Sequence, residues 1–111
     1  MNDKITFEDF TKVDLRVGTV IAVNDFPKAR KPAYQLVVDF GSLGIKKTSA
    51  QITTRYRKEG LLNRQVLAVV NFPKKQIANF MSDCLIVGAV DGKDVVLLKP
   101  EQNVQNGAVV S

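Results

Sequence analysis

The stretch DLRVGTVIAVNDF, residues 14–26, has the length and composition of one long β-strand. Apolar side chains that favour strands recur at alternating positions, namely Leu15, Val17, Ile21 and Val23. Gly18 lies in the interior of the stretch, where a glycine permits a bulge or a sharp bend. Because a long bent strand lets one sheet curl onto itself, this stretch favours a barrel.

The rest of the chain supplies shorter strands. They are expected at residues 34–40, 45–50, 66–71, 84–90 and 95–100. Residues 51–65 have neither strand alternation nor a strong helical stripe, so a short helix or turn is expected between the third and fourth strands. Short strands with one such interruption predict an all-β fold, a five-stranded OB-fold barrel.

The two ends of the chain have their own patterns. Thr6 and Asp9 come close to a helix capping box, and Phe7, Phe10 and Val13 follow with helical spacing. A short N-terminal helix is therefore expected. Residues 101–111 are polar with a final apolar patch, and they predict an extended C-terminal tail.

The strands expected at residues 84–90 and 95–100 are apolar on both faces. Only one face of a barrel strand points inward, so the outer face needs a cover. The helix and the tail can supply part of that cover. A second copy of the chain is expected to supply the rest, as a homodimer, because two-fold dimers are the commonest oligomers.

Length and composition set further limits. The 111 residues, of which 45% are hydrophobic and 24% charged, fit a single domain over residues 1–111. No stretch approaches the ~20 consecutive apolar residues of a membrane span, and the N-terminus lacks the pattern of a signal peptide. We therefore expect a cytoplasmic protein without membrane insertion.

The chain is poor in groups for catalysis and metal binding. It has no histidine, which is the commonest general base and metal ligand, and its one cysteine, Cys84, has no partner for a disulfide. Cys84 is expected to pack as a small hydrophobic side chain, with a reactive thiol as the alternative. We expect no metal, no cofactor, no catalytic residue and no enzymatic activity.

Positive charge is a stronger signal, since 16 basic residues against 11 acidic ones leave a net charge of +5. The basic residues cluster at Lys28, Arg30 and Lys31; at Lys46 and Lys47; at Arg55, Arg57 and Lys58; and at Lys74 and Lys75. Such a field attracts phosphates or acidic polypeptide, although the same charge also suits an ordinary soluble surface.

The polar stretch NFPKKQIANFMSD, residues 71–83, lies between two expected strands and is interpreted as a loop. Lys74, Lys75 and Gln76 have no evident role in a core. Asn71 and Pro73 could instead serve to reverse the chain, and Ser82 and Asp83 could form a local turn.

Two motifs carry a resemblance to a known family. DLRVGTV stands at residues 14–20, and Asn-Phe-Pro with a basic pair, at residues 71–75, is followed by Ser-Asp-Cys-Leu-Ile-Val at residues 82–87. In this order they resemble the tRNA-binding domain family, over residues 6–110. The resemblance implies an OB-fold of the kind found alone or appended to aminoacyl-tRNA synthetases.

Within that family the chain is most similar to the stand-alone dimeric secretion chaperones, on TSAQIT at residues 48–53 and on residues 71–83. The tRNA-binding branches tend to have Ser-Gly-Ile or Ser-Gly-Leu where this chain has Ser-Ala-Gln-Ile at residues 49–52. The similarity implies a chaperone that binds unfolded or precursor proteins for export and works alongside SecA. The alternative is a tRNA-binding OB-fold module, in which the same lysines contact phosphates.

The expected binding site combines apolar pocket walls with a basic rim that carries amide side chains. For either ligand, peptide or RNA, its expected residues are Lys46, Lys47, Ser49, Gln51, Asn71, Lys74, Lys75, Gln76, Phe80, Ser82 and Asp83.

Overall fold

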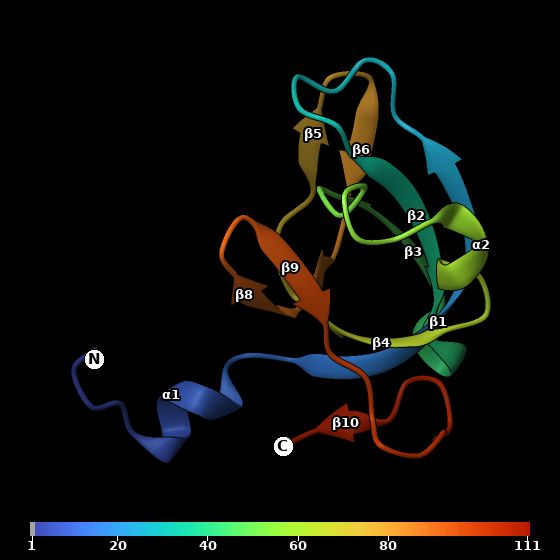
Figure 1. The fold of residues 1–111 in the computed structure, drawn as a ribbon. Coiled ribbons are helices and arrows are strands. Elements are labelled where there is room, and N and C mark those ends of the chain that lie inside the picture. The colour runs from blue at the N-terminus through green and yellow to red at the C-terminus, as the bar shows by residue number, and fades with distance from the viewer. Residues whose placement is uncertain (1) are drawn as a thin grey trace.

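The computed structural model describes residues 2–111 and confirms an all-β, OB-like barrel. The main sheet runs in the order β3-β2-β1-β4-β7 and is nearly closed (Figure 1). Its strands are β1 (Leu15–Asp25), β2 (Tyr34–Asp39), β3 (Ile45–Ala50), β4 (Gln65–Val69) and β7 (Leu85–Ile86). None of the helices in the described chain is long and apolar enough to cross a membrane.

The long strand β1 lies at the centre of this sheet and pairs antiparallel with β2, β4 and the C-terminal strand β10 (Val109–Val110). Its irregularity lies between Val20 and Ala22, where the register with β2 shifts. Gly18, the expected site of a bend, has a different role: a Cβ atom there would stand 2.6 Å from Val38 Cγ1 and 2.7 Å from Phe40 Cε1. The glycine therefore permits β1 to pack closely against the core.

The barrel closes between β3 and the segment that leads into β7. The Asp83 N–H donates to the carbonyl oxygen of Lys47 at 2.8 Å, and the Lys47 N–H donates to Asp83 Oδ1 at 2.7 Å. Beside this pair, the hydroxyl of Ser82, which precedes Asp83, donates to Oγ1 of Thr48, which follows Lys47, at 3.1 Å inside the barrel. An aspartate side chain thus takes the place of one strand-to-strand hydrogen bond.

The core fills the barrel interior. Side chains with no exposed surface include Val20, Leu36, Val38, Phe40 and Leu61. A strand was expected at residues 34–40, and in β2 the buried side chains of Tyr34, Leu36 and Val38 alternate with partly exposed ones. The helix-sized interruption is α2 (Lys58–Leu61), and its Leu61 covers one end of the core.

A second hairpin, β8 (Gly88–Asp91) and β9 (Asp94–Leu97), is tied to the segment before α2. Arg55 contacts the carboxylates of both Asp91 and Asp94 at 3.3 Å. The Tyr56 hydroxyl accepts a hydrogen bond from the Leu97 N–H at 2.9 Å. These contacts hold the hairpin against the main sheet.

Both ends of the chain have the expected form. Helix α1 (Phe7–Thr11) begins at Thr6 with a complete capping box formed with Asp9. The tail ends in β10, which pairs with the start of β1. A 3₁₀ turn, η1 (Gly41–Leu43), connects β2 to β3.

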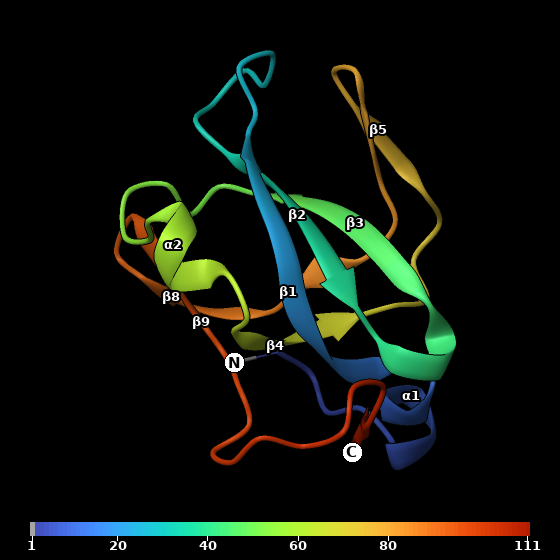
Figure 2. The ribbon, with the colours of Figure 1, turned by 90° about the vertical axis from the view of Figure 1, so that its right-hand side faces the viewer.

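The polar stretch at residues 71–83 differs from the expected loop, because most of it is a β-hairpin. Strands β5 (Lys75–Ile77) and β6 (Phe80–Ser82) pair antiparallel around a two-residue turn in which Ala78 has φ of 53°. The hairpin projects from the same end of the barrel as the loop at residues 26–33 (Figures 1 and 2). Its mostly exposed, polar side chains hide the alternation that marks a strand with one face in a core.

Candidate functional site

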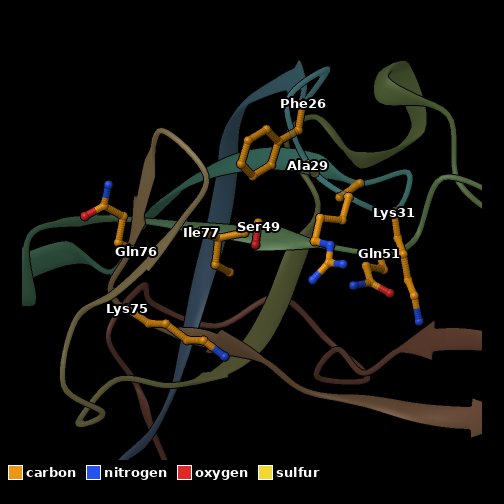
Figure 3. A pocket seen from close by; sticks show the side chains of 10 residues that line it. Phe26, Ala29, Lys31, Ser49, Gln51, Lys75, Gln76 and Ile77 are labelled. Atoms are coloured by element: carbon orange, nitrogen blue, oxygen red, sulfur yellow. The ribbon is translucent and has the colours of Figure 1, made fainter.

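A hollow in the surface lies between the 26–33 loop, the end of β3 and strand β5 (Figure 3). Its volume is about 950 Å³. We call it the basic hollow, and its lining residues are Phe26, Ala29, Arg30, Lys31, Ala33, Ser49, Gln51, Lys75, Gln76 and Ile77.

A second hollow of about 460 Å³ adjoins the first, nearer the base of the hairpin. We call it the apolar hollow, and its lining residues are Thr48, Ser49, Phe72, Pro73, Lys74, Lys75, Ile77, Ser82, Cys84 and Leu85. The two hollows share Ser49, Lys75 and Ile77. Together they form one groove with a basic end and an apolar end.

The positive charge of the groove is not neutralised within the chain. No acidic side chain is among the described residues that line either hollow. The ion pairs found in residues 2–111 use Lys12, Arg16, Arg55 and Lys58, and none uses Arg30, Lys31 or Lys75. The groove therefore presents a field that favours an anionic group.

The groove also exposes a strand edge. In the antiparallel pairing of β2 with β3, alternate residues turn their backbone N–H and C=O groups away from β2. Lys47 is one of them, because both of its groups bond to Asp83. Ser49, two residues later, has the same orientation and lies in the groove. Its carbonyl oxygen accepts from Thr48 Oγ1 at 3.2 Å and keeps a second lone pair, and its N–H faces an extended polypeptide in the groove.

Cys84 lies in the wall of the apolar hollow and is 6% exposed. Burial, reinforced by the nearby charge of Asp83, raises the pKa of the Cys84 thiol to about 12. The thiol stays protonated at neutral pH, so it is a weak nucleophile. Cys84 acts as a small hydrophobic side chain, as expected from the sequence.

The structure brings six of the expected site residues to the groove: Ser49, Gln51, Lys74, Lys75, Gln76 and Ser82. They differ in how they face it. The Gln76 amide donates to the carbonyl oxygen of Ala78 at 3.1 Å, and its side chain points away from Ser49 and Ile77 (Figure 3). The Ser82 side chain is buried against Thr48.

Five expected residues do not line either hollow: Lys46, Lys47, Asn71, Phe80 and Asp83. The Asn71 amide accepts from the Asp14 N–H at 3.0 Å and donates to the Lys12 carbonyl oxygen at 2.7 Å. Asn71 therefore anchors the segment between α1 and β1. The Phe80 ring packs on the ring of Phe26 with centroids 5.5 Å apart, beneath the basic hollow.

Sequence reasoning missed the contribution of the 26–33 loop to the site. Arg30 and Lys31 were recognised as part of a basic cluster that could attract an anionic partner, but they were not among the expected site residues. Phe72, Ile77 and Leu85 were likewise not assigned to a site, although they supply its apolar walls. The sequence signal for this part of the site was a run of basic residues between two prolines. The folded barrel is needed to see that this run faces Lys75.

The described residues also show no cluster of three or more His, Cys, Asp and Glu side chains that could hold a metal ion.

Comparison with known proteins decides the family. Residues 15–109 match the family model of the tRNA binding domain. The chain belongs to the tRNA-binding domain family. Other members of this tRNA-binding domain family include curated methionine–tRNA ligases, such as that of Thermococcus onnurineus, which is 38% identical over 104 residues. The match covers 94% of this chain and only 14% of that ligase.

Solved structures of whole chains are more similar in length and sequence. The chaperone CsaA of Bacillus anthracis is 49% identical with a TM-score of 0.93, and the match covers 98% of this chain and all of the other. The CsaA chaperone of Picrophilus torridus is 48% identical with a TM-score of 0.91, over 97% of this chain and all of the other. This tRNA-binding domain thus has the size and fold of CsaA chaperones.

Proposed function

We propose that this protein is a molecular chaperone, similar to CsaA, that binds unfolded or precursor proteins in the cytoplasm before export, and that it is not an enzyme. The observation that carries the proposal is the groove, which combines apolar walls, unneutralised cations and an open strand edge. The 49% identity to a chaperone over nearly the whole chain supports it.

The three parts of the groove suit an extended polypeptide. Its backbone can accept from the Ser49 N–H and donate to the remaining lone pair of the Ser49 carbonyl oxygen, as in other complexes in which a peptide adds a strand to a sheet. Its apolar side chains can enter the hollow lined by Phe72, Ile77 and Leu85. Backbone pairing is independent of side-chain identity, so one groove serves many precursors. SecA is the expected partner that receives them.

The second candidate function is tRNA binding. It is favoured by the unpaired Lys74 and Lys75 beside Phe72, a ring 53% exposed that could stack on a base. The relationship to methionine–tRNA ligases supports the same candidate. We prefer the polypeptide because the groove offers a strand edge, whose natural partner is another backbone.

We also propose that the chaperone is a homodimer that joins through the surface of α1 and β10. Phe7 is 77% exposed and Val109 is 63% exposed. A hollow of about 460 Å³ lies between these elements, with Phe10 and Val13 in its lining. A second copy would remove these apolar side chains from water.

A direct test uses a fluorescent segment of a secretory precursor that cannot fold, with binding followed by anisotropy. Phe72→Ala and Lys75→Gln each remove an exposed groove side chain, and each should weaken binding about fivefold to tenfold. Lys93→Gln removes the same charge from the exposed β8–β9 turn and should leave binding unchanged. If the segment does not bind and tRNA does, the chaperone proposal is wrong.

A further inference from the structure

The two ends of the groove differ in chemistry. The basic hollow has Arg30, Lys31 and Lys75 as its charged side chains, with the Gln51 amide among them. The apolar hollow is walled by Phe72, Pro73 and Leu85. A ligand that fills both hollows must therefore present two different kinds of side chain.

Both hollows lie on the same side of strand β5. Lys75 and Ile77 stand two residues apart, so their side chains leave the strand on one face, and both line both hollows. Gln76, which lies between them, borders the basic hollow only, and its amide turns away from Ile77 to donate to the Ala78 carbonyl oxygen (Figure 3). An extended ligand chain can reach both hollows only with side chains on one of its own faces.

We propose, on the basis of the chaperone function above, that the groove selects client segments in which an apolar and an acidic side chain are separated by an even number of positions. The apolar side chain enters beside Phe72 and Leu85, and the carboxylate enters beside Arg30 and Lys31. Side chains of an extended chain alternate between its two faces, so residues two or four positions apart point to the same side. Odd separations turn one of the two side chains away from the groove.

The charges favour a carboxylate of a polypeptide over a run of phosphates. Arg30 and Lys31 line the basic hollow only, and Arg30 can hold a carboxylate with two parallel hydrogen bonds. A nucleic-acid backbone carries a charge at every nucleotide and needs a continuous basic track. In the apolar hollow only Lys74 is added to the shared Lys75, and the side chains of Phe72, Pro73 and Leu85 interrupt the track of cations that successive phosphates need.

The test uses isomeric peptides of identical composition. Each has an uncharged host sequence of Ser, Thr, Asn and Gly with one Leu and one Glu, placed two, three, four or five positions apart, in both orders along the chain. We expect isomers with even separations to bind about fivefold to tenfold more tightly than those with odd separations. Calorimetry or anisotropy at low salt measures the difference.

Variants of the intact protein show which hollow binds the Glu side chain and which binds the Leu side chain. Arg30→Gln should remove the preference for a Glu peptide over its Gln counterpart and keep the preference for Leu over Ala. Phe72→Ala should remove the preference for Leu over Ala and keep the preference for the Glu peptide over its Gln counterpart. Both side chains are exposed, so neither change threatens the core, and Lys93→Gln serves as the charge-matched control.

The outcomes separate the two proposals. Equal binding of all spacing isomers, with unfolded precursors still bound, would overturn the spacing rule and leave the chaperone function standing. Binding of RNA with no binding of any peptide or unfolded precursor would overturn the function itself. A spacing preference that survives both Arg30→Gln and Phe72→Ala would place the selective site elsewhere and contradict the proposal.

Discussion

At the scale of single residues, Asn71 shows how a polar side chain beside a binding groove can have a purely structural role. Its amide holds the backbone of Lys12 and Asp14 through two hydrogen bonds of 2.7 and 3.0 Å. We predict that Asn71→Ala lowers the free energy of unfolding by about 1 kcal/mol, because the bonds are exposed to water. Urea denaturation measures this loss, and anisotropy should show unchanged affinity for the precursor segment. Unchanged stability with weakened binding would instead place Asn71 in the site.

Gly18 is the residue where the sequence signal and its structural cause differ. A glycine inside a strand favours a bend, whereas here the register shift lies between Val20 and Ala22. The space above Gly18 is filled by the side chains of Val38 and Phe40. Sequence reasoning identified the glycine as special, but the packing that requires it comes from a partner strand about twenty residues away.

At the scale of elements, the strands of the barrel were predictable and the walls of the groove were not. The sequence predicts strand β2 well because one face of the strand is buried, so Leu36 and Val38 alternate with more exposed residues. The β5–β6 hairpin has little such contrast, since Lys75 and Gln76 are both exposed. A hairpin of this kind forms through its turn and backbone pairing, which leave only a weak trace in the pattern of apolar residues.

The same contrast explains which site residues could be found. Lys75 stood out because it had no evident role in a core, and Ser49 stood out because it belongs to the TSAQIT stretch shared with part of the family. Arg30 and Leu85 belong to a different loop and a different strand. The basic cluster of Arg30 indicated an anionic partner without a position in the site, and Leu85 has no local pattern that indicates a ligand. Their position beside the groove follows from closure of the barrel through Lys47 and Asp83, which is a long-range contact.

At the scale of the whole molecule, the exposed apolar surface of α1 and β10 leads to a prediction about assembly. Sedimentation at micromolar concentration should give twice the mass of one chain, because a second copy covers Phe7 and Val109. Val109→Asp should yield monomers. Leu62→Asp, a matched change at a side chain 46% exposed just after α2, should leave the dimer intact. A wild-type protein that sediments as a monomer at all these concentrations would refute the dimer.

The central claim, that the groove holds polypeptide and is not built for a nucleic-acid backbone, is tested most directly by the salt dependence of binding. A site that neutralises several phosphates releases counterions, so log affinity falls against log salt with a slope of about −0.9 per phosphate, and five contacts imply roughly a thousandfold loss over a fivefold rise in salt. A precursor segment held by apolar walls, a strand edge and one or two carboxylates should lose only about fivefold to tenfold over the same range. We predict micromolar or tighter binding of the unfolded segment with this shallow slope. Binding of tRNA alone, at similar affinity and with the steep slope, would contradict the account.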